Sequence, residues 1–270
     1  MVFARKRFGQ HFLEPAWVEK VVRAIDPKPD DRFLEIGPGG GALTRPLAAR
    51  AKSVVAYEID RDLAAALRDS PVPNVTVIEG DFLGADAQSA IRNQSAVRNP
   101  QSTIRVAGNL PYNVASPILF KLAELHAAGL PLVDATVMLQ REVADRLAAE
   151  PGTAEYGVLS VLMQHVADVE RLLKLPAGAF RPPPRVLSAL VRLRFHAPDP
   201  PVDNPIVFAA VVQAVFTRRR KTLANALLAY RLRSRSAVGE ILAVAQLDGA
   251  RRPETLSVAE FARLADACTS

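Results

Sequence analysis

One stretch decides the fold of this sequence: Arg32-Phe33-Leu34-Glu35-Ile36-Gly37-Pro38-Gly39-Gly40-Gly41. Its first five residues have the composition of a strand, and its glycines let the backbone turn tightly and approach a ligand closely. A helical composition follows at 42–50. The turn lacks the Lys-Ser/Thr ending of a P-loop, so a triphosphate is disfavoured. The stretch therefore predicts a strand, a ligand-binding turn and a helix.

Other strand patterns alternate with helical ones along the first half of the chain. Strands are expected at 54–58, 75–78, 104–108, 135–139 and 188–195. Strands separated by helices indicate βαβ units and a mainly parallel sheet, in which ligands bind beyond the carboxyl ends of the strands. A polar stretch at 84–103 breaks the pattern and predicts a surface loop, with a frayed helix within it as an alternative, and without an assigned function.

The chain changes character near residue 200. A proline loop at 180–185 and a linker-like stretch at 196–201 come before it, and every segment from Pro205 onward is helical in pattern. We therefore expect two domains, a ligand-binding catalytic domain at 1–199 and a small all-helical domain at 200–270.

Positive charge gathers in the last third of the chain. The net charge is +6, yet residues 1–180 hold 20 Lys and Arg against 21 Asp and Glu, whereas residues 181–270 hold 14 against 7. Such asymmetry favours a surface for a polyanion, either nucleic acid or membrane, and on charge alone a solubilising face fits equally well.

Several classes of protein are disfavoured by what the sequence lacks. No apolar run is long enough for a membrane-spanning helix, and the basic start of the chain has no apolar run of a secretory signal behind it. The single cysteine, Cys268, excludes an internal disulfide and a cysteine-based zinc cage, and the histidines lack metal-like spacing. We expect a cytoplasmic protein without a metal site.

Two carboxylates stand at successive strand ends. Glu58 ends the second strand pattern, 21 residues after Gly37, a spacing that suits a carboxylate accepting hydrogen bonds from both ribose hydroxyls of an adenosine cofactor. Asp81 follows the third strand, where it can accept from the exocyclic amine of the cofactor's adenine. With the glycine turn they predict a nucleoside cofactor, which fits both a dehydrogenase and a methyltransferase.

The tetrapeptide Asn109-Leu110-Pro111-Tyr112 after the fourth strand favours a methyltransferase. An adenine amine is a poor nucleophile because its lone pair is delocalised into the ring. The Asn109 side-chain oxygen and the Leu110 carbonyl can accept its two N–H bonds and pull the nitrogen towards tetrahedral geometry. Pro111 stiffens the turn, and the Tyr112 ring offers a face on which a flipped base can stack, which stabilises by about 1–3 kcal/mol.

These motifs resemble those of the ribosomal RNA adenine N6-dimethyltransferases, in the expected order from about residue 5 to 265. The motifs are Phe8-Gly9-Gln10-His11-Phe12-Leu13, Leu34-Glu35-Ile36-Gly37-Pro38-Gly39, Glu58-Ile59-Asp60, Gly80-Asp81, Gly108-Asn109-Leu110-Pro111-Tyr112 and Phe180-Arg181-Pro182-Pro183-Pro184-Arg185-Val186. The first and fifth are the specific ones. DNA amino-methyltransferases more often have a second proline where this chain has Leu110.

The resemblance implies a Rossmann-like seven-stranded α/β methyltransferase sheet with a small helical C-terminal domain. It implies S-adenosylmethionine contacts at six positions: His11, Leu13, Gly37, Glu58, Asp81 and Asn109. It also makes Phe180 a candidate second wall of the target-base pocket, opposite Tyr112, with a core phenylalanine as the equal alternative. Family members often have Asn where this chain has His11, so the details of that contact are open.

Two branches of the family differ in substrate. One dimethylates two adjacent adenines near the 3′ end of 16S ribosomal RNA in the small subunit, and the other methylates one adenine of 23S ribosomal RNA and confers macrolide resistance. The two C-terminal motifs at 216–223 and 252–261 resemble those of the small-subunit branch, which we favour. The alternatives are a DNA adenine methyltransferase, and a non-catalytic ribosome-assembly or transcription factor that keeps the fold.

Basic clusters supply candidate RNA contacts. Arg218, Arg219, Arg220 and Lys221, with Arg231, Arg233 and Arg235, are expected on helices of the small domain, where they would neutralise phosphates without recognising sequence. A solvated helix face is the alternative. Arg5-Lys6-Arg7 is a weaker candidate of the same kind. We expect the protein to act as a monomer on 16S ribosomal RNA within the small subunit.

Overall fold

The computed structural model describes residues 11–84, 87–92, 103–230 and 235–269. The chain forms two compact units. Unit 1 comprises Met1–Ala144 and Asp168–Phe195, and unit 2 comprises Asp145–Ala167 and His196–Ser270. The division differs from the expected one because residues 145–167 belong to the second unit.

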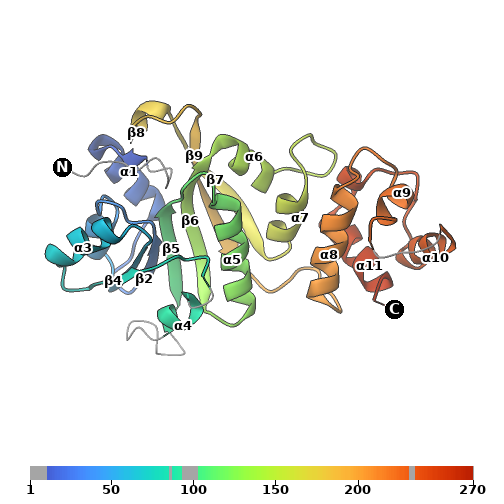
Figure 1. The fold of residues 1–270 in the computed structure, drawn as a ribbon, viewed down its shortest axis with the longest axis horizontal. Helices are drawn as coiled ribbons and strands as arrows, with labels where there is room; N and C mark the ends of the chain where they lie inside the picture. Colours follow the sequence, from blue (N-terminus) through green and yellow to red (C-terminus); the bar gives the residue numbers. More distant parts are fainter. Residues whose placement is uncertain (1–10, 85–86, 93–102, 231–234, 270) are drawn as a thin grey trace. The chain divides into compact units, whose positions relative to one another are not determined.

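A seven-stranded sheet forms the centre of unit 1 (Figure 1). Its strand order is β4-β3-β2-β5-β6-β9-β7. The strands are β2 (Arg32–Ile36), β3 (Ser53–Glu58), β4 (Val75–Glu79), β5 (Ile104–Asn109), β6 (Leu132–Gln140), β7 (Ala167–Leu175) and β9 (Ser188–Phe195). The strands from β4 to β6 pair in parallel, and β9 pairs antiparallel with β6. The expected Rossmann-like seven-stranded sheet is confirmed, and among its strands only β7 has no counterpart in the sequence prediction.

The register of the central strands brings the candidate residues together. Ile36 at the end of β2 pairs with Tyr57 of β3 on one side and with Gly108 of β5 on the other. Glu58 and Asn109 are the residues that follow these two partners, so both lie beside the glycine turn. Because the strands are parallel, their carboxyl ends form one edge, which is where such sheets bind ligands.

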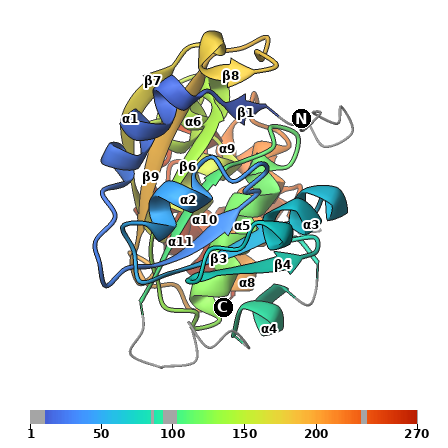
Figure 2. The same ribbon diagram turned by 90° about the vertical axis from the view of Figure 1, so that its left-hand side faces the viewer.

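Helices cover both faces of this sheet, and α1 and α5 lie on opposite sides of it (Figure 2). The helices are α1 (Pro15–Ile25), α2 (Thr44–Ala48), α3 (Arg61–Asp69), α4 (Ala87–Arg92), α5 (Ala115–Ala127) and α6 (Arg141–Leu147), which crosses into unit 2. Asp60 caps α3, since its side chain accepts from Asp62 N at 3.1 Å. Helix α4 lies within the stretch at 84–103, for which a frayed helix is the alternative to a plain surface loop. Residues 85–86 and 93–102 are outside the described part.

A short antiparallel pair stands apart from the main sheet. It joins β1 (Phe12–Leu13) to β8 (Phe180–Arg181), with Leu13 opposite Phe180. The 3-10 helix η2 (Ala177–Ala179) leads into β8. This pair fixes the segment before α1 to the chain just before the proline loop.

Unit 2 is helical. It contains α7 (Val158–Gln164), α8 (Pro205–Phe216), α9 (Leu223–Leu227), α10 (Arg235–Ala245), the 3-10 helix η3 (Pro253–Thr255) and α11 (Val258–Ala267). Tyr156 and Val161 are fully buried in one apolar cluster with Phe208, Val212 and Phe261. This packing explains why residues 145–167 join the C-terminal helices, although they precede β7 and β9 in the chain.

No helix among the described residues is long and apolar enough to cross a membrane.

Candidate active site

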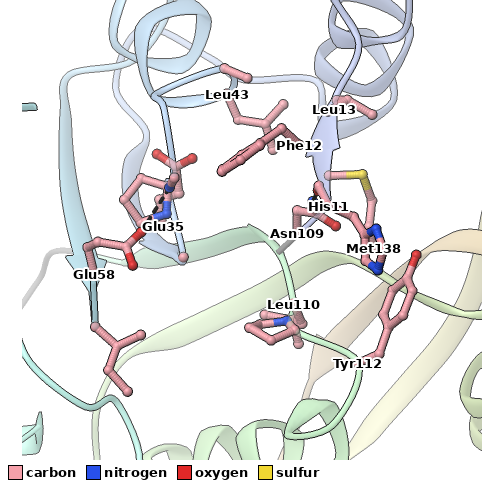
Figure 3. Close-up of a pocket in the computed structure, with 16 residues that line it drawn as sticks. His11, Phe12, Leu13, Glu35, Leu43, Glu58, Asn109, Leu110, Tyr112 and Met138 are labelled. Atoms are coloured by element: carbon pink, nitrogen blue, oxygen red, sulfur yellow. Dashed lines mark hydrogen bonds between the residues drawn. The ribbon is translucent and has the colours of Figure 1, made fainter. Parts of the chain in front are cut away.

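A pocket opens at the carboxyl edge of the sheet in unit 1 (Figure 3). Seven residues predicted from the sequence line it: His11, Leu13, Gly37, Glu58, Asn109, Leu110 and Tyr112. Figure 3 shows Glu35 and Glu58 on one side of the pocket and Asn109, His11 and Tyr112 on the other. The two predicted functions, cofactor binding and base recognition, therefore share one cavity.

The glycine turn that follows β2 lines one side of the pocket. Gly37 has a φ of +68° and Gly39 a φ of +57°, in the left-handed region that favours glycine. A Cβ atom at Gly39 would lie 3.0 Å from the Phe12 ring. A larger residue at Gly39 would therefore strain the turn and displace the segment that covers it.

Glu58 is a buried carboxylate that holds this turn. Its Oε2 accepts from Gly39 N at 2.9 Å and its Oε1 from Asp60 N at 2.8 Å, with the residue only 3 % exposed. Burial raises the pKa of Glu58, while the two backbone donors oppose that rise. A carboxylate has about four lone-pair sites, so acceptors remain for the hydroxyls of a ribose.

Glu35 is a second buried carboxylate in the pocket, and the sequence prediction did not assign it to the site. It is 1 % exposed, lines the pocket, and its Oε2 has no hydrogen-bond partner within the described part of the chain. Burial raises the pKa of Glu35 to about 7, the Thr44 hydroxyl opposes this, and the charge of Glu58 adds to it. Such a group would be stabilised as an anion by a positively charged ligand.

The amide of Asn109 is oriented by the segment that covers the pocket. Its Nδ2 donates to the His11 carbonyl at 2.5 Å. Since the nitrogen is the donor in this bond, Oδ1 is left as an acceptor, the role that the tetrapeptide prediction requires. The Leu110 side chain is buried, and Leu110 N donates to Met138 O at 3.3 Å, which fixes the turn to β6.

Tyr112 is held by two contacts from distant segments. Its hydroxyl lies 2.6 Å from Ser188 Oγ, and its ring stacks on His11 with the centroids 5.2 Å apart. Burial raises the pKa of Tyr112, so its ring is neutral at physiological pH. The ring can take part in aromatic stacking, and in this structure His11 occupies one of its faces.

Comparisons with known proteins identify the family. The family model described as ribosomal RNA adenine dimethylase matches residues 1–266. The chain belongs to this family. It is also 43% identical over 267 residues to the Ribosomal RNA small subunit methyltransferase A of Acinetobacter baylyi, covering 97% of this chain and 92% of that protein.

Solved structures agree with the fold of a ribosomal RNA adenine dimethylase. A dimethyladenosine transferase from Plasmodium falciparum superposes with a TM-score of 0.74 at 23% identity, covering 94% of this chain and 96% of that one. The 23S rRNA methyltransferase ErmE superposes with a TM-score of 0.62 at 28% identity, covering 96% and 100%.

Phe180, a candidate site residue of this dimethylase, is buried in the core beside the pocket. It is 1 % exposed and belongs to an apolar core cluster with Leu13, Met138 and Leu190, and it does not line the pocket. The reason is the alternation of side chains along β8, which turns Phe180 inward and Arg181 outward. The core alternative accounts for this burial, and a role of the Phe180 ring opposite Tyr112 stays a prediction.

Asp81 lies near the pocket without lining it. It is exposed and follows β4, and its Oδ1 accepts from Leu83 N at 2.9 Å. Gly80 N donates to Glu58 O at 2.8 Å, which keeps this loop beside the end of β3. An adenine contact at Asp81 stays a prediction.

The basic cluster of the dimethylase is placed differently from the prediction. Arg218, Arg220 and Lys221 are exposed in the turn between α8 and α9 and not on a helix. Arg219 is partly buried and donates to Thr153 O at 3.0 Å. Arg231, Arg233 and the segment at 5–7 lie outside the described residues.

Six residues that line the pocket were not named as site residues from the sequence: Phe12, Glu35, Ala42, Leu43, Ile59 and Met138. Phe12 and Glu35 stand inside motifs that carried the family resemblance, so motif membership was the available signal for them. Met138 lies within β6, and nothing in its local sequence distinguishes it from a core residue. In the described part of the chain, no group of three or more His, Cys, Asp or Glu side chains is placed to hold a metal ion.

Proposed function

We propose that this protein uses S-adenosylmethionine to dimethylate the N6 amines of two adjacent adenosines near the 3′ end of 16S ribosomal RNA. The family membership supports adenine dimethylation of ribosomal RNA. The name of the Acinetobacter baylyi relative, at 43% identity, favours the small subunit, whereas the identity to the 23S enzyme is 28%. The observation that carries the proposal is the shared pocket of Glu58 and Asn109.

The residues at the pocket fit the cofactor. The glycine turn and Phe12 leave a cradle that a Cβ at Gly39 would fill, and the Glu58 carboxylate faces it. The unpartnered Oε2 of Glu35 suits a cationic group, and S-adenosylmethionine carries both a sulfonium and an ammonium. When bound, the cofactor supplies an electrophilic methyl group. His11 and Leu13 line the same pocket, so their proposed cofactor contacts are within reach.

The protein's own groups prepare the amine. Asn109 Oδ1 and the Leu110 carbonyl accept the two N–H bonds of the amine, which turns its lone pair away from the ring. Positioned acceptors of this kind stabilise charge that develops in the transition state. No strong base is needed, because the amine becomes acidic only as the new N–C bond forms. Tyr112 supplies the stacking face for the extruded base.

Methyl transfer from radiolabelled S-adenosylmethionine tests the proposal. We expect transfer to small subunits that lack these methyl groups, and N6-dimethyladenosine in the digested 16S RNA. Free 16S RNA, 23S RNA and duplex DNA serve as parallel substrates. Transfer only to 23S RNA or only to DNA would overturn the assignment, and cofactor binding without transfer to any of them would favour a non-catalytic assembly factor.

Glu58→Gln tests the cofactor assignment. We expect the dissociation constant for S-adenosylhomocysteine to rise about tenfold or more, because hydrogen bonds to a charged acceptor stabilise by about 1.5–3 kcal/mol. Glu79→Gln is the matched control, since Glu79 pairs with Glu58 in the strand register but is exposed. Isothermal titration calorimetry measures both. Equal affinities for the two variants would contradict the ribose contact.

The same proposal covers partner and location. Arg218, Arg219, Arg220 and Lys221 would contact phosphates of the small subunit's RNA, because cationic side chains neutralise a polyanion without recognising its sequence. A cytoplasmic location follows from a ribosomal substrate. We further propose that the protein acts as a monomer, which sedimentation at assay concentration tests.

A further inference from the structure

The loop at 181–187 carries an unusual pair of side chains. Val186 is 45 % exposed and Leu187 is 46 % exposed. The described part of the chain exposes few other large apolar side chains, and these two are adjacent in sequence. Single exposed apolar residues are ordinary on protein surfaces, whereas adjacent ones on a loop that is held in place indicate a binding surface.

Both ends of this loop are tied to the surroundings of Tyr112. At the first end, His11 Nδ1 donates to Pro182 O at 2.7 Å, and the His11 ring stacks on Tyr112. At the other end, Ser188 Oγ lies 2.6 Å from the Tyr112 hydroxyl. Arg141 N also donates to Leu187 O at 2.9 Å. Val186 and Leu187 are therefore held next to the residue on which the target base is proposed to stack.

The charge of the loop identifies the kind of partner. Residues 181–187 contain two arginines and no carboxylate. Arg185 is exposed, and the Arg181 side chain is 83 % exposed although it pairs with Glu14. Apolar side chains flanked by cations suit a nucleotide, which presents a flat base and an anionic phosphate.

We propose that Val186 and Leu187 form a wedge that packs on the nucleotide next to the target adenosine. Extrusion of a base into a pocket leaves its neighbour without a stacking partner, and apolar side chains are used to fill such gaps in nucleic acid stacks. Arg181 and Arg185 contact the flanking phosphates. This inference rests on the proposed function and adds a substrate contact to it.

Site-specific crosslinking tests the wedge. A photoreactive phenylalanine analogue replaces Leu187, and the full chain is irradiated on small subunits that lack the methyl groups. We expect a crosslink to the nucleotide directly beside the target adenosines, mapped by primer extension. The control carries the same analogue at Val133, which is 43 % exposed at the start of β6, the opposite edge of the sheet. A crosslink to a ribosomal protein or to remote RNA, or none, would overturn the wedge.

Kinetics provide an independent readout. The double variant V186S/L187S should raise KM for small subunits about tenfold, because serine buries much less apolar surface against the base, and it should bind S-adenosylhomocysteine normally. Leu187→Phe, which keeps a stacking surface, should restore KM in the Val186→Ser background. Serine at Val133 is the control. If V186S/L187S matches that control while the wild type transfers methyl groups, the wedge is wrong and the proposed function stands. If the wild type transfers none, the function itself fails.

Discussion

A single hydrogen bond fixes the orientation of the Asn109 amide. Asn109 Nδ2 donates to the His11 carbonyl, so the amide oxygen is left as the acceptor. The carbonyl that fixes this orientation belongs to the segment at 11–13, which covers the pocket. The segment at 11–13 therefore contributes to the target site as well as to the cofactor site. The Phe12 side chain lies against the glycine turn and the His11 ring against Tyr112, while the His11 carbonyl orients the amide that meets the amine.

Asn109→Ala should abolish transfer, and because Asn109 is also an expected cofactor contact, it should weaken cofactor binding by much less than it lowers transfer. Loss of one positioned hydrogen-bonding group lowers kcat by about 10²–10³ in comparable sites. Tyr112→Ala should weaken transfer by about 1–3 kcal/mol through lost stacking, and Tyr112→Phe should keep most of it. Single-turnover methyl transfer measures all three. Near-normal activity of both alanine variants would show that the tetrapeptide is not the reacting site.

Glu35 makes stability depend on pH. Its pKa is raised from 4.5 to about 7, so the folded state holds the proton more tightly than the unfolded state does. The free energy of unfolding of the cofactor-free protein should therefore fall as pH rises through this window. Glu35→Gln removes the free-energy cost of ionising a buried carboxyl group. It should therefore stabilise the protein by about 3 kcal/mol at a pH above the raised pKa of Glu35, and by little at a pH near its ordinary pKa.

Urea denaturation at about pH 5 and about pH 8.5 measures this difference. The fluorescence of Trp17, the single tryptophan, reports on unit 1. Glu79→Gln is again the control, because it makes the same change of side chain at an exposed position. The same gain for Glu35→Gln at both pH values would contradict the buried ionisation.

At the scale of elements, helix α1 is anchored at its C-terminal end. Arg105 on β5 donates to the carbonyls of Ile25 and Asp26, at 2.8 and 3.0 Å, and forms hydrogen-bonded ion pairs with Asp31 and Asp134. Arg192 on β9 donates to Ile25 O as well, at 3.0 Å. These cations satisfy carbonyls that a helix end leaves unpaired, so they hold α1 against the sheet.

Arg105→Met should destabilise unit 1 by about 3–5 kcal/mol, because the buried carboxylate of Asp134 loses its main partner. It should also weaken cofactor binding, since α1 follows the segment that covers the pocket. Arg23→Met is the control. The Arg23 side chain is 79% exposed and pairs with Glu19 on the surface, and such pairs are worth about 0–1 kcal/mol. Urea denaturation followed by Trp17 fluorescence compares the stabilities of the two variants. Equal stabilities would show that Arg105 does not hold α1 against the sheet.

At the scale of the whole molecule, the two ends of the sequence differ in charge. The positive excess lies entirely in residues 181–270, most of which belong to unit 2. The exposed turn of Arg218, Arg220 and Lys221 is a compact part of it. The Arg218 side chain donates to Asn225 O of α9 at 3.3 Å, a longer bond than the one that Arg219 makes, so charge reversal in this turn should cost little helix packing.

Charge reversal of Arg218, Arg220 and Lys221 to Glu should weaken binding to small subunits and leave cofactor binding intact. Arg219 is retained, because it donates to Thr153 O. The salt dependence of binding should become shallower, by roughly one unit of slope for each phosphate that the variant no longer neutralises. Filter binding across a salt series measures both quantities. Unchanged affinity and slope at moderate salt would show that the turn does not touch RNA.

The sequence by itself determined six of the seven strands of the main sheet, the glycine turn and the positions of Glu58 and Asn109. Strand and turn signals depend on neighbouring residues, and parallel strands bring their carboxyl ends to one edge. This rule alone is enough to place Gly37, Glu58 and Asn109 in one pocket.

Only the tertiary structure decided which side chains those positions present to the pocket. Phe180 is buried because β8 pairs with β1, and the residues packed around β2 leave Glu35 Oε2 without a hydrogen-bond partner in the described part of the chain. Tyr112 is held by His11 and Ser188 from opposite ends of unit 1's sequence. Burial and partnership depend on segments far apart in the chain, so local periodicity carries no signal for them.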